Sequence, residues 1–367
     1  MIQHQFCEQP KCDYALRTIV TTLGVVVSLC LLLAGCGGSS GQSGQAASPT
    51  GSSDSTGSTG STSSTSSTSS TSEASDNECS AFSGLNAFGQ SIVNTQFCTL
   101  DHADTEREYF IHVPDVEPDS TPLPVVLSFH GYTSTAETNL GYTGLQPYAE
   151  SEKFIAVYPQ GTVLASTGET HWNSGGTDNK SGADDLGFVE TLLDHLGETH
   201  DIDTDRIYAI GMSNGGMMSY LLACRLSQRI AAITSVTGSM TVDSATCTAS
   251  RPVPVMQIHG VEDRVVPFTG SSDFPTIPAT IEFWAESNGC VGDAEETAIT
   301  DITGDGYGGS RTQYLDCSQG TEVDLIALDG VGHDWPINVD GFRAHDIHAA
   351  DQIWQFLKKF SLYGKIE

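Results

Sequence analysis

The sequence predicts a doubly wound three-layer α/β sandwich, with a mostly parallel central sheet and helices on both faces. From residue 79 onward, short β-rich runs alternate with helical runs, which is the pattern of parallel strands joined by crossover helices. The run at 122–131 is apolar over most of its length, as expected of a central strand buried on both faces. The run at 186–200 places Phe188, Leu192, Leu193 and Leu196 on one side of a helix.

The expected elements follow the same alternation along the chain. Strands are expected where short apolar runs end at Gly, Pro or Asp, at residues 107–114, 122–131, 154–161, 205–211, 231–238, 252–260 and 322–330. Helices are expected where apolar residues recur every three or four positions, at 145–153, 186–200, directly after Ser213, at 279–289 and at 348–360.

The N-terminal segment 1–35 is typical of an export signal. Lys11 and Arg17 precede an apolar run that is too short for a comfortable membrane span and ends on small residues. Its end, L-A-G-C at 33–36, resembles the bacterial lipobox, which implies lipidation of Cys36 and a lipid anchor on the periplasmic or cell-surface side of a bacterial membrane. A soluble secretory signal with an incidental cysteine, and hence a secreted protein, is the alternative.

Residues 36–77 are rich in Gly, Ser and Thr and contain almost nothing that could be buried. We expect a disordered tether with an r.m.s. span on the order of 35 Å. Residues 78–367 are then the single folded domain, which we expect to be a monomer. The chain carries 46 acidic and 15 basic residues, and this excess of negative charge excludes nucleic acid as a partner.

The cysteines indicate an oxidising compartment. Of ten, Cys7, Cys12 and Cys30 belong to the signal and Cys36 to the lipobox, which leaves an even number in the domain. They allow 15 connectivities, of which we favour the pairing that closes short loops: Cys79 with Cys98, Cys224 with Cys247 and Cys290 with Cys317. Spacings typical of metal ligands are absent from the sequence, so we expect no metal and no cofactor.

Residues 211–215, G-M-S-N-G, match the G-x-S-x-G pattern at the junction of an expected strand and an expected helix. The glycines make room for a sharp turn that strains the serine backbone. This turn exposes the Ser213 hydroxyl and directs the N-terminus of the following helix at it. We therefore expect Ser213 to be a nucleophile.

A serine nucleophile needs a base and an orienting carboxylate. Asp263 follows the expected strand 252–260, and His333 follows 322–330. Glu262 is the rival acid, and His333 could instead be an ordinary loop residue. We expect the backbone N–H groups of Tyr132 and Asn214 to form the oxyanion hole.

Several motifs occur together in the order of a known family: "VVLSFHG", "FIAVYPQG", "HWNSGG", "IDTDRIYAIGMSNGG", "IHGVEDRVVP" and "GVGHDWP". In these, the chain resembles the α/β-hydrolase esterases that include polyhydroxybutyrate depolymerases, feruloyl esterases of types B to D and LpqC lipoproteins, within carbohydrate esterase family one. The resemblance implies ester hydrolysis through Ser213, Asp263 and His333 without a cofactor. It also implies the disulfides Cys224–Cys247 and Cys290–Cys317.

The resemblance implies an ester substrate, either a hydroxycinnamoylated or otherwise acylated polysaccharide or a hydroxyalkanoate oligomer. We favour feruloyl or related acyl groups; hydroxybutyrate oligomers and acetylated xylan are alternatives, and peptide hydrolysis or non-catalytic surface binding are other function classes. Relatives often have a cysteine before the residue equivalent to Trp172, where this chain has His171, so we expect a looser loop there.

Three further features have two interpretations each. Trp172 and Trp335 either stack on the substrate or pack within loops. His130 is expected to brace its loop rather than act in catalysis. Asp184 and Asp185 are expected to cap a helix. The run at 301–306 is similar to a calcium loop, but its twelfth position is Thr312 instead of glutamate, so we do not assign a calcium site.

Overall fold

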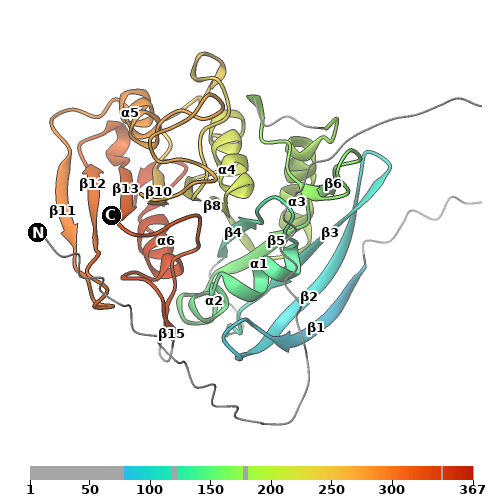
Figure 1. The fold of residues 1–367 in the computed structure, drawn as a ribbon. Coiled ribbons are helices and arrows are strands. Elements are labelled where there is room, and N and C mark those ends of the chain that lie inside the picture. Colours follow the sequence, from blue (N-terminus) through green and yellow to red (C-terminus); the bar gives the residue numbers. More distant parts are fainter. Residues whose placement is uncertain (1–77, 118–121, 177–180, 340–341, 367) are drawn as a thin grey trace, which may run out of the picture. The chain divides into compact units, whose positions relative to one another are not determined.

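An 11-stranded sheet forms the centre of the computed structural model, in the order β1-β2-β3-β5-β4-β8-β9-β10-β13-β12-β11 (Figure 1). The model describes residues 78–117, 122–176, 181–339 and 342–366. All of these lie in one compact unit, Ser70–Glu367. The predicted signal 1–35, the tether 36–77 and Cys36 lie outside the described residues.

The middle of the sheet is parallel and its edges are antiparallel. β5, β4, β8, β9, β10 and β13 run parallel to one another, whereas β1, β2 and β3 on one side and β12 and β11 on the other pair antiparallel. The strands of this sheet are β1 (Cys79–Leu85), β2 (Ser91–His102), β3 (Thr105–His112), β4 (Leu123–Phe129), β5 (Ile155–Pro159), β8 (Ile202–Met212), β9 (Ala232–Val236), β10 (Val255–Gly260), β11 (Glu295–Ile299), β12 (Gly309–Tyr314) and β13 (Val323–Leu328).

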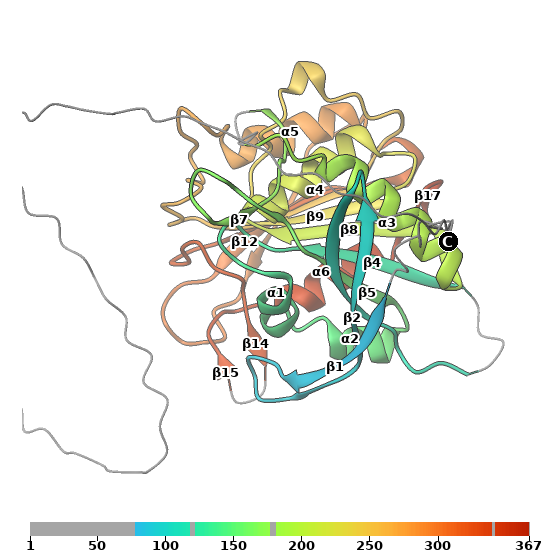
Figure 2. The same cartoon turned by 90° about the vertical axis from the view of Figure 1, so that its right-hand side faces the viewer.

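Helices cover both faces of the sheet (Figure 2). On one face, α3, α4 and α5 contribute to one apolar core, and on the other face, α1, α2 and α6 contribute to a second. The helices are α1 (Ala136–Tyr142), α2 (Gln146–Glu152), α3 (Asp185–Thr199), α4 (Asn214–Arg225), α5 (Ile277–Ser287) and α6 (Ala349–Leu357). Short hairpins complete the described fold: β6 (Thr162–Val163) with β7 (Thr170–His171), β14 (Asn338–Val339) with β15 (Phe342–Arg343), and β16 (Phe360–Ser361) with β17 (Gly364–Lys365).

The predicted three-layer sandwich is confirmed, and every expected strand and helix is present. Along β4, β5, β9, β10 and β13 every residue is buried, which explains why these strands are mostly apolar. The sequence analysis missed β1, β2, β11, β12 and α1. β1 and β11 are mostly exposed edge strands, so they carry no apolar run that would indicate a strand.

All three predicted disulfides are present: Cys79–Cys98, Cys224–Cys247 and Cys290–Cys317. Cys79 and Cys98 are direct partners across β1 and β2. Cys224 lies in the last turn of α4, and Cys247 directly follows the 3-10 helix Ser244–Thr246. Among the described residues, no helix is long and apolar enough to cross a membrane.

A buried ion pair joins β3 to the start of α3. Arg107 Nη2 donates to Asp185 Oδ1 at 2.8 Å, and the Arg107 and Asp185 side chains are 5% and 0% exposed. Asp185 Oδ2 also accepts the backbone N–H of Asn173 at 2.8 Å. Of the two predicted capping residues, Asp184 caps α3 by accepting the Gly187 N–H, whereas Asp185 serves this buried network instead.

We expect Arg107→Met to lower the free energy of unfolding by about 3–5 kcal/mol, because it leaves the Asp185 carboxylate buried without its charge partner. Urea denaturation measures this loss. The matched control is Arg229→Met, since Arg229 forms a 2.8 Å pair with Asp194 on the surface, where the two side chains are 35% and 67% exposed. Such a pair contributes about 0–1 kcal/mol, so equal losses in the two variants would contradict the prediction.

Candidate active site

Ser213 lies at a strained turn between β8 and α4. Its φ is 54° and its ψ is −119°, a backbone conformation that is rare for a residue with a side chain. The close packing of the turn explains the glycines on either side. A Cβ on Gly211 would lie 2.4 Å from the Gly215 carbonyl carbon, and a Cβ on Gly215 would lie 2.1 Å from the Phe129 carbonyl oxygen.

The structure brings Asp263 and His333 into direct contact. His333 Nδ1 lies 2.7 Å from Asp263 Oδ2, while Asp263 Oδ1 accepts the backbone N–H groups of Val265 and Val266 at 2.8 and 2.9 Å. Because an ionised carboxylate only accepts hydrogen bonds, Nδ1 donates, and Nε2 is left as the acceptor that a general base requires. Glu262, the rival acid, is exposed.

The pKa of Asp263 lies well below its usual range. Burial alone would raise the pKa, because the carboxyl group is only 4% exposed. Hydrogen bonds from His259, His333 and the Val266 N–H outweigh burial because they favour the charged form. Asp263 is therefore ionised at neutral pH, as a partner of a protonated histidine must be.

Ser213 and His333 are brought to the same end of the sheet. β8, β9, β10 and β13 are parallel neighbours, so the loops after their carboxyl ends meet along one edge. One side chain connects the two loops directly: the Tyr142 hydroxyl donates to Met212 Sδ at 3.5 Å, and its ring packs edge-on against Trp335 at 5.8 Å. Met212 precedes Ser213, and Trp335 is two residues beyond His333.

The two predicted oxyanion donors come from segments that adjoin Ser213. Asn214 is the first residue of α4, where backbone N–H groups point out of the helix and favour negative charge. The loop that contains Tyr132 touches the turn, since a Cβ on Gly131 would lie 3.5 Å from Ser213 Cβ. This arrangement supports the predicted oxyanion hole.

His130 braces the oxyanion loop, as expected. Its Nε2 accepts the Gly161 N–H at 2.9 Å, so its Nδ1 carries the proton and donates to the Gly131 carbonyl at 2.8 Å. Burial lowers the pKa of His130 to about 4, and the ring is therefore neutral at physiological pH.

The prediction that Trp172 and Trp335 stack on the substrate is wrong. Their side chains are 0% and 2% exposed, so neither presents a ring face to a ligand. Trp172 instead supports the site from behind. Its indole N–H donates to the His130 carbonyl at 3.0 Å, and its backbone N–H and C=O bond to the Asn214 side chain at 2.7 and 3.0 Å.

The expected looser loop around His171 is also not observed. Residues 171–174 are all buried. His171 Nδ1 lies 3.0 Å from the Thr162 carbonyl, and its Nε2 lies 2.8 Å from Ser181 Oγ. Hydrogen bonds from His171 and Asn173 therefore hold this segment in the place where relatives carry further cysteines.

A cavity of about 620 Å³ lies between the segment 240–244 and the segment 271–283, and its volume is within the size range of small-molecule sites. The segment 240–244 closely follows Gly238, where a Cβ would lie 2.9 Å from the Ser213 carbonyl oxygen. The opposite wall belongs to the chain that follows Asp263. Apolar side chains form much of the lining, and hydroxyl and carboxylate groups the rest: Met240, Val242, Phe274, Pro275, Ala279 and Phe283, with Thr241, Asp243, Ser244, Ser271, Ser272, Asp273 and Thr280. The pocket could not be predicted from the sequence, because the segments that line it carry no motif.

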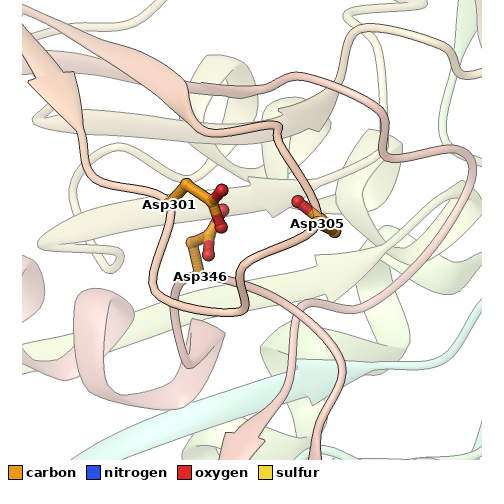
Figure 3. Close-up of side chains that lie close together, drawn as sticks. All are labelled: Asp301, Asp305 and Asp346. Atoms are coloured by element: carbon orange, nitrogen blue, oxygen red, sulfur yellow. The ribbon is translucent and has the colours of Figure 1, made fainter.

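The tertiary structure adds a third carboxylate to the loop at 301–306. Oxygens of Asp301, Asp305 and Asp346 lie within 4.8 Å of one another (Figure 3). Backbone N–H groups already bond to all three carboxylates: Asp301 accepts from Gly304 and Gly306, Asp305 accepts from Tyr307, and Asp346 accepts from the two residues after Asp301. These bonds shape the loop, and we assign no metal to it.

Residues 116–280 match the family model described as phospholipase/carboxylesterase. Relatives include a bifunctional acetylxylan esterase/xylanase of Neocallimastix patriciarum (25% identity over 71% of this chain), the putative esterase NocK of Nocardia uniformis subsp. tsuyamanensis (28% over 68%) and feruloyl esterase B of Piromyces equi (26% over 70%). The aligned parts cover 34%, 76% and 46% of these proteins, so the chain spans only a third to a half of two of them.

The solved acetyl xylan esterase of Aspergillus awamori is similar in fold, with a TM-score of 0.50, 15% identity, and coverage of 69% of this chain and 94% of that one. The predicted α/β-hydrolase fold is thereby confirmed, and so is the resemblance to feruloyl and acetylxylan esterases. The predicted enzyme class, carboxylic ester hydrolase, agrees with the names of these relatives.

Proposed function

We propose that the protein hydrolyses carboxylic esters with Ser213 as nucleophile, His333 as base and Asp263 as its partner, as the match of residues 116–280 to the phospholipase/carboxylesterase family model leads us to expect. The single observation that carries the proposal is the 2.7 Å contact between His333 Nδ1 and Asp263 Oδ2. The two residues come from separate loops at the sheet edge where Ser213 occupies its strained turn.

In the proposed reaction, the Ser213 oxygen attacks the ester carbonyl carbon while His333 Nε2 takes the hydroxyl proton. Asp263 stabilises the imidazolium, and the N–H groups of Tyr132 and Asn214 stabilise the oxyanion. His333 then gives its proton to the leaving alkoxide, which departs as the alcohol. Water attacks the acyl-enzyme in the same way and releases the carboxylic acid.

For the substrate, we propose a feruloyl or related acyl group on a polysaccharide. Two of the relatives described above are named as a feruloyl esterase and an acetylxylan esterase, and the apolar lining of the 620 Å³ cavity suits an acyl group larger than acetyl. Rates on methyl ferulate, acetylated xylan and a hydroxybutyrate trimer test the assignment. Failure to turn over any hydroxycinnamate ester would refute it.

We propose that this cavity receives the acyl group, and we expect Ala279→Trp to lower kcat/KM for methyl ferulate by about 10-fold or more, because an indole at the start of α5 would fill it. The value for p-nitrophenyl acetate should change by less than about threefold, since a small acyl group leaves the cavity free. Ala298→Trp, on the exposed strand β11, is the matched control. A uniform loss on both esters in Ala279→Trp would show that the cavity does not hold the acyl group.

We further propose that residues 1–35 direct export, that Cys36 carries a lipid and that 36–77 tether the domain to a membrane. Three disulfides among the described residues support an oxidising compartment. Labelled palmitate incorporation and membrane fractionation of the full chain and of its Cys36→Ser variant test the anchor. If the Cys36→Ser variant fractionates like the unaltered chain, the lipid anchor is refuted and the enzyme is secreted instead.

A further inference from the structure

A second histidine lies against the carboxylate of Asp263. His259 is on β10, four residues before Asp263, and its side chain is 0% exposed. Its Nε2 lies 3.4 Å from Asp263 Oδ2, the same oxygen that His333 Nδ1 contacts at 2.7 Å. The carboxylate therefore lies between two imidazoles, one facing the substrate side and one buried behind it.

The hydrogen bonds of Gln257 define the tautomer of His259. Gln257 Nε2 donates to the Gly238 carbonyl at 3.0 Å, and a carbonyl can only accept, so the amide nitrogen faces this way. The same nitrogen lies 2.8 Å from His259 Nδ1, which must therefore accept. The ring proton is on Nε2, which donates to the Val266 carbonyl at 2.8 Å and lies 3.4 Å from Asp263 Oδ2.

The same network reaches the helix that begins at the nucleophile. The Tyr220 hydroxyl donates to Gln257 Oε1 at 2.7 Å. Tyr220 is fully buried on α4, the helix whose first residue follows Ser213. Gly238, the other partner of Gln257, packs against the Ser213 backbone. A continuous buried chain of hydrogen bonds thus joins the surroundings of the nucleophile to those of the acid.

We propose that His259 is a positioning residue for the reaction, which holds Asp263 Oδ2 toward His333 and, through Gln257 and Tyr220, fixes the carboxylate relative to Ser213. This inference rests on the proposed function. Burying three polar side chains costs free energy unless each of them has hydrogen-bond partners. A buried network in which every group has its partners specifies one arrangement of side chains, whereas an apolar core would allow several. Here the network fixes the Asp263 carboxylate, and this carboxylate orients the His333 ring.

The first test compares His259→Phe with His259→Gln on a p-nitrophenyl ester. Phe removes the polar N–H beside the Asp263 carboxylate and its bond to the Val266 carbonyl at similar volume, so we expect kcat to fall about 10-fold with KM within about twofold. Gln keeps an amide N–H close to the Nε2 position and should recover most of kcat. His112→Phe is the control, because His112 is equally buried on β3; it should lower the unfolding midpoint and leave kcat unchanged.

A double-mutant cycle with Asp263→Asn separates positioning from general stability. If His259 acts through the Asp263 carboxylate, His259→Phe should cost little in the Asp263→Asn background. An equal fold-loss in both backgrounds, or an unchanged kcat in the single variant, overturns the inference. If His259→Phe does not fold, Tyr220→Phe replaces it in the cycle, with an expected loss in kcat of about fivefold. An equal fold-loss in both backgrounds, or an unchanged kcat in Tyr220→Phe, then overturns the inference.

The wild-type chain shows which proposal has failed. A folded wild type that neither hydrolyses esters nor reacts with a fluorophosphonate at Ser213 refutes the proposed function. An active wild type, combined with a His259→Phe variant of unchanged kcat, refutes only the role of His259.

Discussion

Ser213→Ala is expected to reduce kcat for p-nitrophenyl acetate by on the order of 10⁶, because no other group at the turn can form the acyl-enzyme. Binding should be little affected, since the hydroxyl is small and the cavity is lined by other residues. Steady-state kinetics with the domain 78–367 measure the loss, and a fluorophosphonate probe followed by peptide mass spectrometry locates the reactive serine.

Ser219→Ala is the matched control for this variant. Ser219 is a buried serine on the helix that follows Ser213, where its hydroxyl donates to the carbonyl of Gly215 at 3.1 Å. Its loss should leave kcat within a few-fold of the wild type. Full activity in Ser213→Ala, or probe label on another serine, would remove the basis of the proposed mechanism.

Asp263→Asn is expected to reduce kcat about 10⁴-fold with a small change in KM. The amide can still accept the Val265 and Val266 N–H groups through its oxygen, so the loop should keep its shape. The amide nitrogen would face His333 Nδ1, however, and would favour the tautomer whose Nε2 carries a proton and cannot act as base. The missing negative charge would also leave the imidazolium without stabilisation.

Glu262→Gln is the control for Asp263→Asn, because it makes the same chemical change at the adjacent, exposed position. We expect it to change kcat by less than about twofold, as is usual for a surface substitution. A larger loss in Glu262→Gln than in Asp263→Asn would reassign the carboxylate. Thermal unfolding of both variants shows whether a loss of activity reflects a loss of structure.

Much of the central fold could be predicted from the sequence, because its signals are local. A strand buried on both faces is mostly apolar, and β4, β9 and β13 are buried along their whole length and mostly apolar. The two glycines around Ser213 are required by contacts within the turn itself. The predicted disulfides close short loops, so pairing neighbours in sequence was sufficient.

Exposure of side chains could not be predicted in the same way. Trp172 and Trp335 belong to motif-bearing loops, and nothing local shows that other segments cover their rings completely. The antiparallel edges β1 and β11 were missed for a related reason: exposed strands are held by pairing with a neighbour, and pairing leaves no periodic apolar pattern in the strand itself.

The sequence by itself therefore determined the fold class and the strained serine turn, since the signals for both depend on residue types within a few positions of one another. Only the tertiary structure decided which acid meets His333, which loops line the cavity and that His259 lies behind Asp263. These are contacts between the ends of different strands. Their distances depend on how the whole sheet brings those ends together, and no local pattern encodes them.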